Sequence, residues 1–221
     1  QIESLRYLFQ CTDDLFLSDK IEEAKIVYKK LFNLLEECEI DEYQLEIDIR
    51  EERARYARCV YDTTPESERL PELATAMKLN AHSYSVYSLE QSLPFFQDVL
   101  DCTDREISGL KSFYKDWREY LLSMKDRDRI RIASLLVEAE YYLQGYAGIA
   151  NLARKWADDQ PYGYLYWLHC LLLEQNFEEL NKVAEEALKK LSPGYAREEV
   201  SDYLIKAGLL TDNFNKILQG K

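Results

Sequence analysis

Only a few residues of this chain have types and a spacing that could do chemistry. The most direct candidate is the adjacent pair His169 and Cys170, because an imidazole beside a thiol could act as a base and a nucleophile. Consecutive residues of a helix point about 100° apart, however, so the two side chains do not face each other. We therefore predict that Cys170 is a buried, unreactive thiol and that His169 packs in the core.

Metal and phosphate sites are not predicted either. A di-metal centre in a helical bundle needs Glu-x-x-His pairs, and neither His82 nor His169 follows a glutamate at that distance. Adjacent aspartate pairs begin at Asp13 and Asp158, near predicted helix ends, where acidic side chains are typically solvated or cap the helix. The sequence contains no Gly-rich phosphate loop. We expect no catalytic residue, no metal, no cofactor and no enzyme activity.

The charge balance argues against nucleic acid as a partner. The chain has 41 acidic and 28 basic side chains, a net charge of -13. Proteins that bind duplex nucleic acid need a basic surface that displaces counterions from phosphates. The most basic segment, residues 125–131, alternates its cations with aspartates, so much of its field cancels locally.

An acidic run joins two of the predicted helices. A solvated helix junction is its simplest interpretation, and a docking patch for a basic partner is the alternative. The residues of this candidate docking patch are Glu36, Glu37, Glu39, Asp41 and Glu42.

Aromatic residues gather in one stretch of the second half of the chain. Tyrosine and tryptophan are enriched at binding hot spots, because they bury a large area at a low cost in entropy. A core between helices is the simpler interpretation, and a partly exposed groove formed by Tyr146, Tyr164 and Trp167 is the candidate partner-binding surface. The cluster comprises Tyr141, Tyr142, Tyr146, Trp156, Tyr162, Tyr164, Tyr166 and Trp167.

The elements that must position these residues are all predicted to be helices. Apolar residues recur at three- and four-residue steps, and glycines and prolines are few, so about ten or eleven helices joined by short turns are expected. Asp41 with Gln44, and Thr103 with Glu106, are predicted capping boxes, and Gly208 is expected to close a helix. The predicted helices cover residues 2–17, 21–38, 41–61, 72–93, 103–121, 130–143, 149–157, 162–174, 177–191, 195–207 and 211–218.

The most polar stretch of the chain suggests an internal boundary. Residues 62–71 carry two of the 5 prolines and several charged side chains. We expect N-terminal helical hairpins over residues 1–61, a polar connection over 62–71 and a main helical array over 72–221. The two parts are expected to pack as one superhelical body.

Two segments resemble tetratricopeptide-type repeats, in which small and aromatic residues recur at fixed spacing on the second helix of each pair. Residues 21–32 carry Ala24, followed by Tyr28, and residues 177–188 carry Ala184, followed by Ala187. The resemblance implies an all-α fold, an α-α superhelix of antiparallel helix hairpins, whose concave surface binds peptides or other proteins.

One known feature of that family is missing from these segments. Some members hold a partner's terminal carboxylate with Lys and Asn one turn apart on the first helix. The corresponding positions hold Leu165 and His169 in one unit, and Phe9 and Asp13 in the other. The resemblance therefore implies an apolar or basic ligand.

The cysteines and the hydropathy pattern bear on location. The 5 cysteines are scattered and odd in number, which favours reduced thiols and a cytoplasmic protein. No apolar run is long enough to span a membrane. We expect a non-enzymatic protein-interaction module of a larger protein, without nucleic acid or membrane partners. A regulatory domain that binds a small ligand between helices, and a structural or homodimerising segment, are the alternatives.

Overall fold

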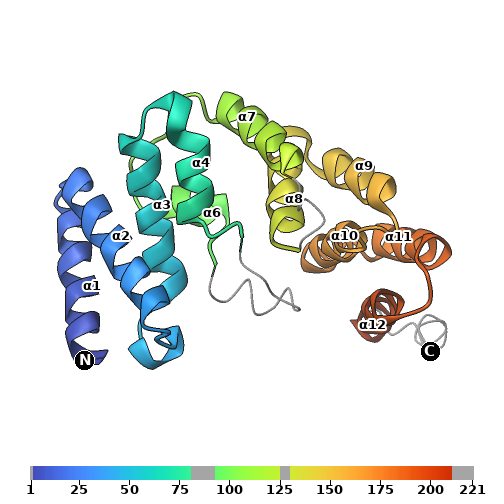
Figure 1. The fold of residues 1–221 in the computed structure, drawn as a ribbon. Helices are drawn as coiled ribbons and strands as arrows, with labels where there is room; N and C mark the ends of the chain where they lie inside the picture. The colour runs from blue at the N-terminus through green and yellow to red at the C-terminus, as the bar shows by residue number, and fades with distance from the viewer. Residues whose placement is uncertain (1, 81–92, 125–129, 211–221) are drawn as a thin grey trace. The chain divides into compact units, whose positions relative to one another are not determined.

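The computed structural model describes residues 2–80, 93–124 and 130–210 and divides the chain into two compact units (Figure 1). Unit 1 comprises Gln1–Leu110 and unit 2 comprises Lys111–Lys221. The described residues contain eleven α-helices and one short 3-10 helix, which confirms the predicted all-α class. None of these helices is long and apolar enough to cross a membrane.

Unit 1 is a series of helices that pack mainly against their sequence neighbours. Figure 1 shows α1, α2 and α3 side by side and alternating in direction. Arg6 of α1 also donates a hydrogen bond of 2.8 Å to the carbonyl oxygen of Leu45. The elements are α1 (Ile2–Leu17), α2 (Ile21–Glu37), η1 (Glu42–Leu45), α3 (Ile49–Thr63), α4 (Glu66–Ala76) and α6 (Phe96–Asp101).

Aromatic rings fill the core between α1, α2 and α3. Phe9 and Phe32 make an edge contact at 5.5 Å between ring centroids, and Phe32 lies 5.7 Å from Tyr56. Ala24 and Tyr28 are fully buried on the same face of α2, as their spacing predicts. The periodicity of residues 21–32 therefore forms one side of a helix-pair interface.

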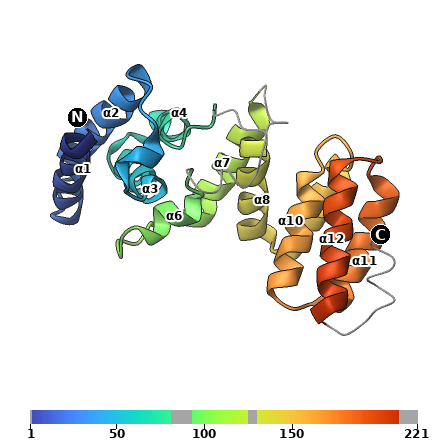
Figure 2. The ribbon, with the colours of Figure 1, turned by 90° about the horizontal axis from the view of Figure 1, so that it is seen from below.

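Unit 2 repeats the arrangement of sequential antiparallel helix pairs. Neighbours from α8 to α12 pack in order, and α10 also contacts α12; Figure 2 shows α10, α11 and α12 together. Asn176 caps α11 by accepting a hydrogen bond from the backbone N–H of Glu179 at 3.3 Å. The elements are α7 (Leu110–Ser123), α8 (Ile130–Gln144), α9 (Tyr146–Trp156), α10 (Tyr162–Leu173), α11 (Phe177–Lys190) and α12 (Tyr195–Leu210).

Two glycines allow close helix packing in unit 2. A Cβ atom on Gly148 of α9 would lie 2.5 Å from the carbonyl oxygen of Glu140 on α8. A Cβ atom on Gly163 of α10 would lie 2.8 Å from the Cα atom of Ala153 on α9. Both distances are shorter than van der Waals contact, so the crossings of α9 with α8 and α10 require glycine.

Two predicted helix starts are wrong. Asp41 precedes only the short η1; the backbone at Glu46 has a positive φ of 51°. Helix α3 instead begins at Ile49, after Asp48, whose carboxylate accepts from the N–H of Glu51 at 3.0 Å. Helix α7 begins at Leu110 rather than at Thr103.

The helix boundaries inside the chain also differ from the prediction. Residues 62–71 form the end of α3 and the first turns of α4, with Pro71 inside that helix, rather than a connection. The compact units divide after Leu110, and the division into residues 1–61, 62–71 and 72–221 stays a prediction. The predicted helix over 72–93 ends at Ala76, where Lys78 has a φ of 55°. Residues 81–92 and the predicted helix 211–218 lie outside the described residues.

The C-terminal elements follow the prediction more closely. Helices α10 and α11 match the predicted ranges 162–174 and 177–191. Helix α12 differs at its end, because Gly208 does not close it but lies buried within it. The short helix α6 was not predicted.

Candidate functional site

Two of the three predicted groove residues are core residues. Tyr164 and Trp167 of α10 are buried, and their rings stack 6.4 Å apart. The hydroxyl of Tyr164 donates to Glu186 of α11 at 2.8 Å, and Arg154 of α9 donates to the same carboxylate at 2.8 and 2.9 Å. Arg154 also lies 5.1 Å from the ring of Trp167. Both rings of α10 are therefore buried against side chains of α9 and α11 and do not line an open groove.

The third predicted residue, Tyr146, lies at the surface. It is half-buried at the start of α9, and its ring makes an edge contact with Tyr141 of α8 at 5.5 Å. Burial and a hydrogen bond to the carboxylate of Glu174 raise the pKa of Tyr146. Since Glu174 follows the last residue of α10, Tyr146 connects three helices at one place.

Exposed apolar side chains lie on α8 and at the end of α10, the two elements that Tyr146 contacts. Tyr141 and Tyr142 are 45% and 42% exposed, and Leu173 at the end of α10 is 69% exposed. Cys170 lies three and four residues before Leu173 and Glu174 and so shares their face of the helix. The thiol of Cys170 also contributes to raising the pKa of Tyr146. We call these residues, Tyr141, Tyr142, Tyr146, Leu173 and Glu174, the tyrosine patch; Tyr141 and Glu174 contact Tyr146, whereas Tyr142 follows Tyr141 on α8 and packs on Tyr114.

Rigid elements hold the tyrosine patch. Gly145 has a φ of 61° and reverses the chain between α8 and α9, and its N–H donates to the carbonyl of Tyr141 at 2.7 Å. Tyr142 stacks on the buried ring of Tyr114 at 4.1 Å between centroids. The close approach at Gly148 keeps α9 against α8. The exposed rings therefore have a fixed support.

The predicted acidic docking patch is partly neutralised inside unit 1. Lys78 lies 3.3 Å from Glu36 and 3.9 Å from Glu42, and Arg53 of α3 lies 2.5 Å from Glu42. Glu37 and Glu39 are exposed and have no ion pair within the described part of the chain. Asp41 is also exposed. The five residues are thus near one another, but two of them hold helices together.

A buried acidic cluster lies between α1, α2 and α3. Tyr28 donates a hydrogen bond to Asp13 at 2.6 Å, and Arg55 lies 3.0 Å from Asp13 and 3.5 Å from Glu52. Burial, together with a hydrogen bond to Asp13 and its charge, raises the pKa of Glu52 to about 9. One Glu52 oxygen has no hydrogen-bond donor, which fits a carboxyl group that carries its own proton.

The proton on Glu52 predicts a pH dependence of stability. Between pH 4.5, its usual pKa, and about 9, the folded chain keeps this proton and the unfolded chain releases it. Stability contributed by Glu52 therefore falls as pH rises through this range. We expect the free energy of unfolding of Glu52→Gln, relative to that of the wild type, to rise by more than about 1.4 kcal/mol from pH 5 to pH 8.5. Urea unfolding followed by circular dichroism measures both profiles.

The matched control is Glu51→Gln. Glu51 is half-exposed and pairs with the same Arg55 at 2.5 Å, but it lies outside the buried cluster. Its removal should shift the stability of unit 1 by less than about 1 kcal/mol at every pH. Parallel pH profiles for the wild type and Glu51→Gln are expected, and a Glu52→Gln profile parallel to both would disprove the protonated state of Glu52.

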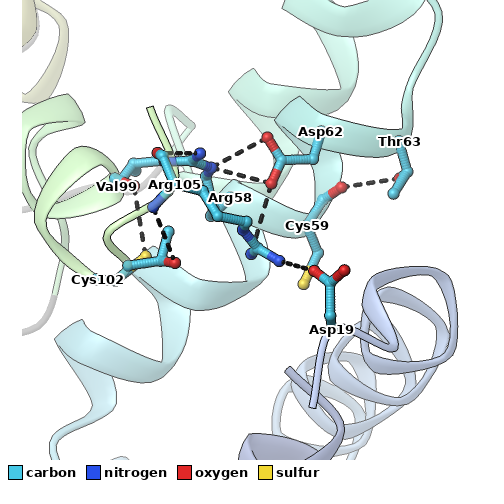
Figure 3. Close-up of polar contacts among 9 residues, drawn as sticks. Asp19, Arg58, Cys59, Asp62, Thr63, Val99, Cys102 and Arg105 are labelled. Atoms are coloured by element: carbon cyan, nitrogen blue, oxygen red, sulfur yellow. Dashed lines mark hydrogen bonds and ion pairs between the residues drawn. The ribbon is translucent and has the colours of Figure 1, made fainter. Parts of the chain in front are cut away.

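An open cleft of about 660 Å³ in unit 1 is lined by α1, the turn after it and the loop after α6. Figure 3 shows Arg105 of that loop between Asp62 and Asp19, at 3.5 and 2.5 Å. Beneath it Arg58, 1% exposed, pairs with Asp62 at 3.0 Å and donates to the carbonyl of Arg105 at 2.6 Å. Arg58, Asp62, Arg105 and Asp19 therefore pair with one another, as residues that hold the structure together do.

Cys170, the candidate nucleophile, is half-buried rather than buried, and it is held as a thiol, as are two other cysteines. Burial raises the pKa of Cys170 and Cys102 to about 11 and that of Cys59 to about 12. His169 is exposed on α10, so its predicted place in the core is wrong. Helix α10 is apolar on nearly every side, and its composition did not show which side its neighbours cover. His82 lies outside the described residues.

Comparisons with other proteins assign no family. Comparison with family models, with curated proteins and with solved structures finds no match to this chain. Within residues 2–80, 93–124 and 130–210, no group of three or more His, Cys, Asp or Glu side chains could hold a metal ion. The chain is therefore described by its sequential antiparallel helix pairs alone.

Sequence reasoning missed part of the surface. It placed Tyr141 and Tyr142 in the aromatic cluster, but it did not separate them from the buried rings. Leu173 and Glu174 lie at the end of the predicted helix 162–174, and no site is predicted there. Their spacing from Cys170 was a usable signal, since residues three and four apart on a helix share a face. Which helix that face meets could not be read from one sequence.

Proposed function

We propose that this chain is a non-enzymatic helical protein that binds another protein or a peptide through the tyrosine patch. The observation that carries the proposal is the exposure of Tyr141 in contact with the half-buried Tyr146, over a rigid support. Tyrosine rings on rigid elements are typical anchors of protein interfaces, because little side-chain entropy is lost when they are covered.

We also propose that the helix pairs belong to an α-α superhelix of the tetratricopeptide type. Fully buried Ala24, Ala184 and Ala187 at the predicted spacing support it, because small side chains let paired helices approach closely. In this proposal the helices form a scaffold and the partner is recognised at the surface of unit 2.

Affinity capture with matched variants tests the proposed function. The full chain is used as bait in cell extract, and recovered proteins are quantified by mass spectrometry. We expect Tyr141→Ala with Tyr146→Ala to lose a specific partner at least tenfold, because truncated hot-spot residues cost about 2 kcal/mol or more. Circular dichroism should show unchanged helix content.

The control is Tyr195→Ala. Tyr195 is 72% exposed on α12 and lies outside the tyrosine patch. It should retain the partner at the wild-type level. If every partner of the wild type is recovered equally well with the double variant, or if none is recovered, the proposed function is wrong.

A further inference from the structure

We infer that the tyrosine patch takes a cationic side chain, Lys or Arg, from a peptide segment that also carries an adjacent apolar residue. This inference rests on the proposed function and names the chemistry of the partner. Its basis is a comparison of two tyrosine–glutamate pairs in unit 2, one of which has a cation of its own and one of which does not.

The first pair is complete within the chain. Tyr164 donates to Glu186, and Arg154 binds the same carboxylate at 2.8 Å. The guanidinium of Arg154 also lies 5.1 Å from the ring of Trp167. Three groups thus surround one cation: a carboxylate, the tyrosine that orients it, and a second aromatic ring. Such an arrangement combines an ion pair with a cation–π contact.

The second pair also combines a carboxylate, a tyrosine and a second aromatic ring, here a tyrosine, but has no cation among the described residues. Tyr146 is hydrogen-bonded to Glu174, and the ring of Tyr141 lies 5.5 Å from that of Tyr146. Glu174 is exposed, and no Lys or Arg pairs with it in the part of the chain that the structure describes. A peptide cation on these rings would take the place that Arg154 has in the first pair.

The surroundings favour the same occupant. Leu173, 69% exposed and next to Glu174, offers an apolar contact to the residue beside the cation. An acidic or neutral segment would leave the carboxylate of Glu174 without a counter-charge under the bound partner, which is unfavourable.

A positional-scanning library of synthetic hexapeptides, incubated with the full-length chain, tests the inference. We expect the wild type to select Arg or Lys next to Leu, Ile, Met or Phe. Glu174→Gln should reduce the preference for Arg or Lys about tenfold, since a charge-assisted hydrogen bond contributes about 1.5 kcal/mol or more. Circular dichroism and tryptophan fluorescence should show that the variant remains folded.

Glu199→Gln is the matched control. Glu199 accepts a hydrogen bond from Tyr195 of the same helix α12, so this variant alters a tyrosine–glutamate pair outside the patch. It should select peptides as the wild type does. The inference is supported only if the preference for cations disappears with Glu174→Gln and persists with Glu199→Gln.

The remaining outcomes separate the inference from the proposed function. Peptides selected without a cation, yet lost with Tyr146→Ala, overturn the inference and leave the proposed function standing. Selection that does not depend on the patch, or no selection at all, counts against both. If light scattering shows a dimer that Tyr141→Ala dissociates, a second copy occupies the patch, and the inference is wrong.

Discussion

Replacing Asp62 with alanine is expected to destabilise unit 1 by about 3 kcal/mol. Asp62 is the carboxylate partner of the buried Arg58, and it also lies 3.5 Å from Arg105. Without Asp62, the cation of Arg58 stays buried with no counter-charge. Urea unfolding followed by far-ultraviolet circular dichroism measures the loss. Tryptophan fluorescence reports on unit 2 instead, because all 3 tryptophans lie there.

Two further variants show whether the charge is the cause. Asp104→Ala removes an exposed aspartate at the edge of the same cleft and should change stability by less than about 0.5 kcal/mol. Arg58→Met in the Asp62→Ala background should recover part of the loss, because the unpaired cation is then absent. A loss of equal size for both aspartates would contradict the buried ion pair.

Replacing Gly163 with alanine is expected to destabilise unit 2 by about 2 kcal/mol. The added methyl group would lie 2.8 Å from the Cα atom of Ala153 and 3.1 Å from the ring of Trp156, so α10 must move away from α9. That movement would also separate Glu174 from Tyr146 across the same helix pair. Urea unfolding followed by tryptophan fluorescence measures the effect.

The sign of this change separates packing from helix propensity. In an unconstrained helix, alanine is more favourable than glycine by about 0.5–1 kcal/mol. A variant that equals or exceeds the wild type in stability would therefore show that α9 and α10 do not approach closely at Gly163. Weakened partner binding by the folded variant would support the position of Glu174 in the patch.

Helical periodicity predicted the helices whose one face is clearly apolar. In α2, Ala24 and Tyr28 repeat at four residues and are both fully buried, since only one face of the helix meets its neighbours. The capping signals at Asp41 and Thr103 were less reliable. Short polar turns use the same side-chain contacts as helix starts.

The candidate site was harder to predict because burial depends on tertiary neighbours. Helix α10 is apolar on nearly every side, and its sequence does not distinguish the buried Tyr164 from the exposed His169. Arg58 and Asp62 are one helical turn apart and form a recognisable pair. The carbonyl of Arg105, by contrast, comes from 47 residues away and becomes a partner only in the folded chain.

Titration calorimetry with the captured partner tests the role of the tyrosine patch most directly. We expect Tyr141→Ala with Tyr146→Ala to raise the Kd at least about 30-fold, which corresponds to 2 kcal/mol. Tyr195→Ala should leave the Kd within about twofold. Equal Kd values for the wild type and both variants, with helix content unchanged, would contradict the assignment of binding to this surface.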